Sequence, residues 1–239
     1  MAQWFEPQVL AEKAALVAQK APSEVNVGGD FGSYAKANRG GGLADSGIEN
    51  HNLINASGRV AQYAHLLRRT DFRRIADMGC GLGLTSNALA RRYQAAQVTG
   101  FEVSSDAVQF ASRQFPSCRF VEMAISPGLS LGGLYDLIVC QEFYPFTRTS
   151  DSAIHRDFVS HFLDHLVPGG ILLVELSERE REKSILVTID NLGVAFTSHL
   201  LPYDRVFRNF PIFMPAILAS GLLRIATRKP VNRVLLFRK

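Results

Sequence analysis

The sequence predicts an open α/β fold in which helices cover both faces of a parallel sheet. From residue 73 onward, short apolar segments alternate with segments of helical spacing, and strands that are buried on both faces have this composition. A glycine-rich turn joins the first predicted strand to the helix after it, at the place where doubly wound sheets bind their ligands. The 239 residues suffice for one well-packed domain with a short appendage.

Composition and charge exclude several classes of protein. An apolar fraction of 47% with 20% charged residues rules out wholesale disorder. Three cysteines without a CxxC pair form neither a disulfide framework nor a zinc site, and they are typical of a reducing compartment. The net charge of +4 is too small to imply nucleic acid by itself. The first residues lack the layout of a signal peptide, and no apolar run reaches about 18 residues, so we expect a cytoplasmic protein.

Residues 1–70 are predicted to form a helical and loop lid ahead of the sheet. Residues 8–20 and 54–67 have helical spacing, and the segment between them holds seven glycines and few large apolar side chains. Long loops in compact proteins are usually functional. We therefore expect residues 28–50 to order over the site when its ligands bind.

Turn and cap signals separate the elements that follow. A serine at 104 or 105 caps one helix, and Val-Pro-Gly-Gly at 167–170 ends another. Strands are predicted at residues 73–78, 96–103, 118–125, 135–140 and 171–176, with helices at 85–93, 105–115 and 151–166. Two further strands, at residues 194–201 and 231–238, enclose an apolar segment that contains prolines.

The turn after the first strand reads Asp-Met-Gly-Cys-Gly-Leu-Gly from Asp77 to Gly83. Its glycines allow backbone N–H groups to approach a ligand without obstruction by a Cβ atom. Glu102 follows Gly83 by 19 residues and ends the second predicted strand, where an acid accepts hydrogen bonds from ribose hydroxyls. The combination predicts an adenosine-type ligand. The structural alternatives are that the glycines serve strand–helix packing alone and that Glu102 is an ordinary exposed strand end.

Asp77 helps to choose between two adenosine ligands. An acid two residues before the first glycine can accept a hydrogen bond from a ligand ammonium, whereas it would repel a pyrophosphate placed nearby. Asp77 therefore favours S-adenosylmethionine over a dinucleotide, although it could also act as a cap beside the helix.

Four segments give the chain a resemblance to the class I S-adenosylmethionine-dependent methyltransferases. They are IADMGCGLG, VTGFEVS, YDLIVCQEF and LVPGGILLVE, and the resemblance covers residues 73–239. It implies a Rossmann-like, doubly wound sheet of seven strands, mostly parallel with the last strand antiparallel, in a binding domain at residues 71–239. It also implies S-adenosylmethionine as cofactor and S-adenosylhomocysteine as product.

The resemblance implies a set of cofactor-binding residues. The glycine loop would hold the methionine part of the cofactor, Glu102 the ribose, and the residues after the third strand the adenine. Many members carry an acid after the third strand, whereas this chain offers apolar side chains and the Ala124 amide. The residues concerned are Asp77, Gly79, Cys80, Gly81, Gly83, Glu102, Val103, Met123, Ala124 and Gln141. For Cys80, the alternative interpretation is a small residue that serves packing.

Candidate bases lie at or just beyond the active edge of the fourth strand: Glu142, Tyr144 and His155. Glu142 has the alternative role of orienting the cofactor or capping a helix, and His155 that of an exposed residue without a role. The segment after this strand lacks the Asn/Asp-Pro-Pro-Tyr/Phe and Pro-Cys signatures, which argues against methylation of DNA adenine or cytosine C5.

Acceptor-binding candidates end the glycine-rich lid: Tyr34, His51, Asn52 and Asn55. His161 and His165 are spaced as a metal pair, but without a third ligand in the motif they favour a surface or packed face, and no metal is predicted. The arginines before the first strand and at the end of its helix are interpreted as solvated faces.

The predicted function is methyl transfer to a small-molecule, sugar or lipid-linked acceptor, at oxygen. An RNA methyltransferase, an NAD-dependent dehydrogenase with the same glycine loop and a binding module without activity remain as alternatives. Apolar residues 210–225, in an insertion at about 205–229, have cationic flanks. They would form a wall of the acceptor pocket, a homodimer contact or a membrane-surface contact, and the last of these would make the protein peripheral to a membrane.

Overall fold

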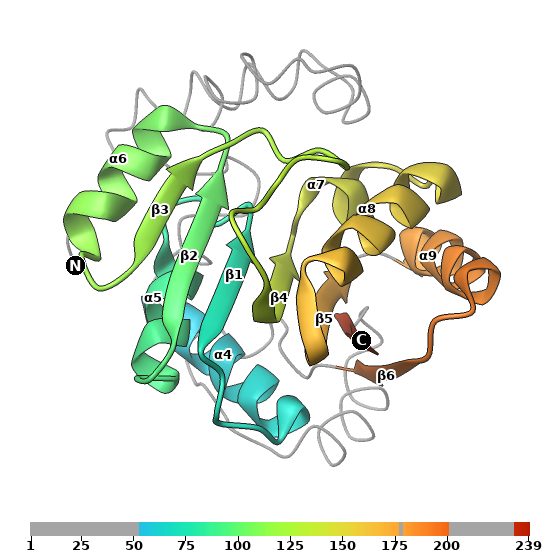
Figure 1. Cartoon of the computed structure of the whole chain (residues 1–239), viewed down its shortest axis with the longest axis horizontal. Coiled ribbons are helices and arrows are strands. Elements are labelled where there is room, and N and C mark those ends of the chain that lie inside the picture. The colour runs from blue at the N-terminus through green and yellow to red at the C-terminus, as the bar shows by residue number, and fades with distance from the viewer. Residues whose placement is uncertain (1–52, 177–178, 201–231) are drawn as a thin grey trace, which may run out of the picture.

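The computed structural model describes residues 53–176, 179–200 and 232–239, and these form a seven-stranded sheet flanked by helices (Figure 1). The elements in chain order are α4 (Leu53–Leu67), β1 (Arg74–Met78), α5 (Leu84–Arg92), β2 (Gln97–Glu102), α6 (Ser105–Gln114), β3 (Arg119–Glu122), β4 (Tyr135–Gln141), α7 (Tyr144–Arg148), α8 (Ser152–Asp164), β5 (Leu166–Leu176), α9 (Arg179–Leu192), β6 (Phe196–Leu200) and β7 (Arg233–Arg238). Three predictions, the lid at residues 28–50, the helix at 8–20 and the insertion at 205–229, lie outside the described residues.

The strand order is β3-β2-β1-β4-β5-β7-β6. Strands β1 to β5 pair in parallel, and β7 lies antiparallel between β5 and β6. The prediction of a doubly wound, mostly parallel sheet with an antiparallel last strand is confirmed. In the part of the chain that the structure describes, no helix combines the length and apolar character needed to cross a bilayer.

The strands divide their side chains between two hydrophobic clusters, one on each face of the sheet. Ile75 and Leu137 belong to the cluster under α4 and α5, whereas Ala76 and Ile138 belong to the cluster under α8 and α9. Successive side chains of a strand point to opposite faces, so these strands are buried on both sides. Burial on both sides explains why they read as continuous apolar runs.

Several element boundaries differ from those predicted. The helix predicted at 151–166 ends at Asp164, and β5 begins at Leu166, ahead of the Pro-Gly-Gly turn. Tyr135 pairs with Leu166 and Leu137 with Ile171, so the turn is an irregularity inside a strand. The strand predicted at 118–125 ends at Glu122. Helices α7 and α9 are present where no helix was predicted.

Candidate functional site

The glycine loop folds over the end of β2. The backbone N–H groups of Gly79 and Cys80 both donate to the carbonyl oxygen of Phe101, at 2.8 and 3.0 Å. Cys80 is buried, and its Sγ atom lies so close to β2 that a Cβ atom added to Gly100 would be only 2.7 Å from it. Cys80 therefore packs between the loop and β2, and burial raises the pKa of its thiol.

Two glycines of the loop have different surroundings. Both have a left-handed backbone, with φ of 52° at Gly81 and 76° at Gly83. A Cβ on Gly83 would come within 2.6 Å of the Phe120 ring, whereas a Cβ on Gly81 would meet no atom within 4 Å. Gly83 thus serves close packing of α5 on the sheet, and Gly81 faces open space. This open space is what a ligand lying against the loop requires.

Glu102 ends β2 with a buried side chain, 3% exposed. One carboxylate oxygen accepts hydrogen bonds from the N–H groups of Val103 and Ser104, at 2.9 and 3.0 Å, and the other accepts from Gly81 N–H at 3.0 Å. Three backbone donors therefore fix this carboxylate at the mouth of the loop. Glu102 is not the exposed strand end of the alternative interpretation.

Asp77 lies at the base of the loop and is 2% exposed. Its carboxylate accepts a hydrogen bond from the Ser86 hydroxyl of α5 at 2.7 Å. Burial raises the pKa of Asp77 to about 6, with the Ser86 hydrogen bond opposing this shift and the charge of Glu102 adding to it. A buried carboxylate of this kind is stabilised in its charged form by a cationic group placed against it.

The predicted adenine-binding residues lie beside Glu102, where β2 and β3 end. Val103, Met123 and Ala124 are half-buried. The N–H of Met123 donates to the Glu102 carbonyl oxygen at 2.8 Å, which places the residues after β3 against the end of β2. Their role toward the adenine stays a prediction.

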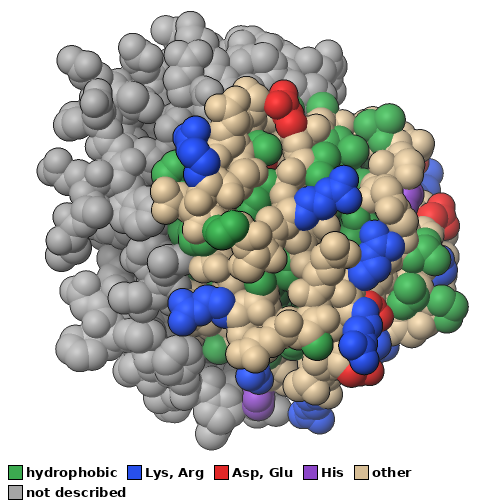
Figure 2. Space-filling model, turned by 60° about the vertical axis from the view of Figure 1, so that its left-hand side comes forward, with side chains coloured by type: hydrophobic (Ala, Val, Ile, Leu, Met, Phe, Trp, Pro, Cys, Tyr) green, Lys and Arg blue, Asp and Glu red, His purple; other side chains and the backbone are tan. Residues whose placement is uncertain are grey.

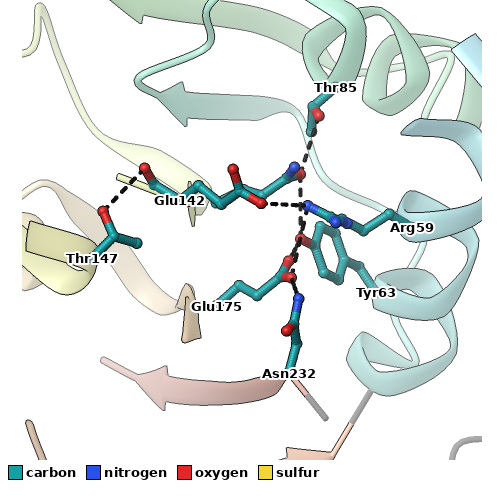
Figure 3. A network of polar contacts seen from close by, with 8 residues as sticks. Arg59, Tyr63, Thr85, Glu142, Thr147, Glu175 and Asn232 are labelled. Atoms are coloured by element: carbon teal, nitrogen blue, oxygen red, sulfur yellow. Dashed lines mark hydrogen bonds and ion pairs between the residues drawn. The ribbon is translucent and has the colours of Figure 1, made fainter. Parts of the chain in front are cut away.

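A polar network that the sequence did not predict lies at the ends of β4 and β5 (Figure 3). Its centre is Glu175 of β5, which is 1% exposed. The Tyr63 hydroxyl of α4 donates to one oxygen of Glu175, and the Asn232 amide, just before β7, donates to the other at 2.6 Å. Burial and then the charge of Glu175 raise the pKa of Tyr63, so Tyr63 remains a donor.

The network connects to the helix that follows the glycine loop. Thr85 of α5 donates to the Gln141 side-chain oxygen at 3.1 Å, and the Tyr63 hydroxyl lies 3.4 Å from the same oxygen. Gln141, predicted to bind the cofactor, therefore lies between the glycine-loop helix and the Glu175 cluster.

Arg59 joins this network to Glu142. Its Nη1 atom lies 3.7 Å from one carboxylate oxygen of Glu142 and 3.7 Å from one of Glu175. The side chain of Arg59 is 7% exposed and that of Glu142 is 41% exposed. Glu142 has a left-handed backbone with φ of 51°. This side chain is the part of the network that reaches the surface.

The other two candidate bases are packed into the protein. His155 is fully buried, so the expectation of an exposed residue was wrong. Its Nε2 atom lies 2.6 Å from the Pro145 carbonyl oxygen, and its Nδ1 atom lies 3.3 Å from the Ser184 hydroxyl. Burial lowers the pKa of His155 and raises that of Tyr144, which is half-buried and packs edge-on against Phe158. Of the three candidates, Glu142 alone is exposed at the end of β4.

The remaining candidates fall in two groups. Tyr34, His51 and Asn52 lie outside the described residues, and Asn55 lies in α4 with a side chain that the structure does not describe. His161 and His165 accept hydrogen bonds from the loop before β4, from Gly128 N–H at 3.3 Å and Leu131 N–H at 3.4 Å. The two histidines thus form a packed face. Within the described ranges, no three His, Cys, Asp or Glu residues are grouped to hold a metal ion.

The sequence analysis did not identify Arg59, Tyr63 and Glu175 as functional candidates. Two weak signals could have found them. Arg59 and Tyr63 are spaced i, i+4 on a predicted helix, and Glu175 is a charged residue within the apolar segment ILLVEL.

The fold and the site define a class of protein. A glycine loop and an acid at the end of β2 lie together at the carboxyl edge of a doubly wound sheet, where folds of this kind bind their ligands. The antiparallel β7 between β5 and β6 distinguishes this sheet from an all-parallel one. Residues 75–170 match the family model described as "Methyltransferase domain". These findings support a class I S-adenosylmethionine-dependent methyltransferase domain, as the resemblance predicted.

Curated relatives support this assignment. The trans-aconitate 2-methyltransferase of Rhodopseudomonas palustris (strain BisB18) is 30% identical over 114 residues, which are 48% of this chain and 42% of that protein. The enzyme of the same name from Paracidovorax citrulli is 30% identical over 111 residues, 46% of this chain and 41% of that protein. The chain thus spans less than half the length of these relatives.

Solved structures share the fold at low identity. The N-methyltransferase NodS from Bradyrhizobium japonicum WM9, in complex with S-adenosylhomocysteine, superposes with a TM-score of 0.52 and 14% identity over 82% of this chain and 92% of that one. The plantazolicin methyltransferase BpumL, also with S-adenosylhomocysteine, gives a TM-score of 0.51 and 14% identity over 97% and 99%. The family match and the curated relatives favour the methyltransferase over the dehydrogenase alternative.

The site residues fit S-adenosylmethionine. Gly81 faces space that a Cβ could enter without contact. The carboxylate of Glu102 is held at that space and can accept from ribose hydroxyls, and the buried carboxylate of Asp77 suits an ammonium.

Proposed function

We propose that the chain transfers a methyl group from S-adenosylmethionine to an oxygen of a small-molecule acceptor. The observation that supports this most is the exposed carboxylate of Glu142 at the end of β4. The next residue, Phe143, packs against the glycine loop, so close that a Cβ on Gly79 would lie 3.1 Å from its ring. This contact of the neighbouring residue supports a position of Glu142 beside the glycine loop, near the acceptor of the proposed reaction.

Different residues of the chain have different roles in this reaction. When bound, S-adenosylmethionine supplies a methyl group on a positively charged sulfur, which an oxygen nucleophile displaces in line. Asp77 and Glu102 hold and orient the cofactor, and orientation of two reactants contributes much of the rate of such a displacement. Glu142 accepts the hydrogen bond of the acceptor hydroxyl and takes its proton as the new bond to carbon forms.

The class of acceptor is inferred from the relatives and from the sequence. The names of the curated relatives state trans-aconitate as their acceptor, which supports a small molecule. Sugar and lipid-linked acceptors stay within the proposal because of the apolar residues 210–225, which lie outside the described residues. Contact of that segment with a membrane surface or a second copy is likewise a proposal.

Basic side chains give the RNA alternative little support. Figure 2 displays the Lys and Arg side chains of one face as separate groups among other side chains, within the part of the chain that is described. Arg69 pairs with Asp136 at 3.5 Å, and the Arg74 guanidinium lies 4.9 Å from the centre of the Tyr135 ring. These two arginines serve internal contacts.

A methyl-transfer assay with labelled S-adenosylmethionine tests the proposed function. The acceptor panel holds trans-aconitate and other carboxylic acids, phenols, sugars, lipid-linked sugars, amines and RNA. We expect transfer to a small-molecule oxygen and, for a hydroxyl acceptor, a loss of about a hundredfold in Glu142→Gln, while cofactor affinity measured by calorimetry is retained. Transfer to RNA or to nitrogen alone, or cofactor binding without transfer to any acceptor, would contradict the proposal.

A further inference from the structure

The carboxylate of Glu142 forms an ion pair with a buried cation, the guanidinium of Arg59. The Arg59 guanidinium is almost inaccessible, with a side chain 7% exposed, and it lies 3.7 Å from the carboxylates of both Glu142 and Glu175. In Figure 3 the Glu142 side chain extends toward Arg59, while its backbone carbonyl oxygen faces Thr147. An ion pair with one buried partner and one exposed partner fixes the exposed one without covering it.

Arg59 is in turn paired with Glu175, a buried carboxylate that other residues hold in place. Glu175 accepts hydrogen bonds from Tyr63 and Asn232, and its side chain is 1% exposed. The two donors come from α4 and from the residue before β7, and Glu175 itself lies in β5. A buried cation remains in place only when charged and hydrogen-bonded partners offset its loss of water, and Glu175 is such a partner.

The backbone of Glu142 is strained. It is a non-glycine residue with φ of 51°, in a region that L-residues occupy rarely and that recurs at active sites and ligand clamps. Thr147 donates to the carbonyl oxygens of Glu142 and Phe143, at 3.4 and 3.1 Å, and so holds the turn between β4 and α7. Both the backbone and the carboxylate of Glu142 are therefore fixed by other groups.

We propose that Arg59 is a positioning residue for methyl transfer: it holds the Glu142 carboxylate at the acceptor side of the site, and Glu175 holds Arg59. This inference rests on the proposed function, because it assigns a support to the residue that meets the acceptor. It predicts that Arg59 acts on the rate through Glu142 and contributes little to cofactor affinity.

A double-mutant cycle tests the coupling. The variants are Arg59→Met, Glu142→Gln and the double variant, with kcat and KM measured for labelled S-adenosylmethionine and for the best hydroxyl acceptor of the panel. We expect Arg59→Met to lower kcat at least tenfold and Arg59→Lys to recover part of the loss. The double variant should be no slower than Glu142→Gln alone. Cofactor affinity by calorimetry should stay within threefold of wild type.

Arg69→Met is the matched control. Arg69 precedes β1, and its guanidinium also forms an ion pair with a largely buried carboxylate, that of Asp136, at 3.5 Å. It should leave kcat unchanged. If Arg59→Met does not fold, Glu175→Gln replaces it; this variant keeps the side-chain size and weakens the hold on Arg59, so kcat should fall.

The inference is overturned if kcat of Arg59→Met equals that of wild type, if the two single losses multiply in the double variant, or if cofactor affinity falls as much as kcat. A wild type that methylates only nitrogen or RNA overturns the proposed oxygen transfer alone, and the same cycle with that acceptor still decides the role of Arg59. A wild type that binds the cofactor and methylates nothing overturns both.

Discussion

Glu102 and Asp77 are both buried carboxylates near the glycine loop, yet their surroundings differ. Three backbone N–H groups surround Glu102, whereas the donors to Asp77 in the described structure come from one residue, Ser86, through its hydroxyl and its backbone. Backbone donors hold a carboxylate in its charged form, and burial with few donors raises its pKa, as for Asp77. The two acids are therefore suited to different parts of the cofactor, a neutral ribose and a cationic amine.

Replacing Glu102 should weaken cofactor binding. Glu102→Ala removes the acceptor for the ribose hydroxyls, and losing hydrogen bonds to a charged group costs about 2–3 kcal/mol, or roughly 30- to 150-fold in Kd. Calorimetric titration with S-adenosylhomocysteine measures this change. Glu122→Ala is the control, since Glu122 pairs with Glu102 in the sheet but is exposed. An affinity of Glu102→Ala within twofold of wild type would remove Glu102 from the ribose site.

Two glycine variants should distinguish the glycine that serves packing, Gly83, from the glycine that faces the ligand, Gly81. Gly81→Ala and Gly83→Ala both strain a left-handed residue, at about 1 kcal/mol. Gly83→Ala also forces a Cβ within 2.6 Å of Phe120 and 2.9 Å of Ala111, and overpacking adds about 1–3 kcal/mol. Urea unfolding should therefore detect the larger loss of stability in Gly83→Ala. Calorimetry should detect the larger loss of cofactor affinity in Gly81→Ala, and equal effects of the two variants on both quantities would refute the distinction.

At the scale of the element, the strands were predictable and part of the site was not. Apolar runs and turn residues are local signals, so all seven strands were expected near their observed positions. The polar network depends on contacts between residues far apart in the chain, such as Tyr63 and Glu175, which are separated by 112 positions. No local pattern states which face of α4 meets β5. Helix α9 was missed because its first half, Arg-Glu-Arg-Glu-Lys, lacks the apolar spacing that marks a core helix.

Helix α7 depends on His155. The ring lies 2.6 Å from the Pro145 carbonyl oxygen of α7 and 3.1 Å from that of Thr149, and Ser184 of α9 contacts its other nitrogen. His155→Leu leaves these buried groups without their partner, which costs about 1–3 kcal/mol. We expect a lower thermal midpoint with cofactor affinity retained. His199→Gln, at a half-buried edge position, should change the midpoint little, and an unchanged midpoint in His155→Leu would show that the ring does not support α7.

At the scale of the whole molecule, the network joins the two ends of the described chain. Arg59 and Tyr63 come from α4, and Asn232 comes just before β7. Their side chains contact Gln141 and Glu175 near the carboxyl ends of β4 and β5, which is the edge of the sheet that carries the glycine loop. Folding of the last strand and formation of the proposed acceptor side of the site are thereby coupled, because the hydrogen bonds to Glu175 form only when both segments are in place.

The pH dependence of stability and of cofactor binding should share one cause. The folded pKa of Asp77 is raised by burial to about 6 from an ordinary 3.8, so between these values the folded state binds a proton that the unfolded state lacks. The contribution of Asp77 is therefore fully favourable below the unfolded pKa and is lost as the pH rises through about 6, by up to about 3 kcal/mol. Urea unfolding of wild type and Asp77→Asn from pH 4 to 7 isolates this contribution as the difference between their slopes.

A cofactor ammonium at Asp77 favours the charged carboxylate, so cofactor binding must displace the proton at low pH. Affinity for S-adenosylmethionine in wild type should fall about tenfold for each pH unit below the pKa of about 6. Asp77→Asn has no proton to lose there, so its affinity should be weaker and nearly constant from pH 4.5 to 6.5. Calorimetry over this range checks both curves. Parallel curves for the two proteins would mean that the ammonium does not lie against Asp77, and that the acid serves the packing of α5 through Ser86.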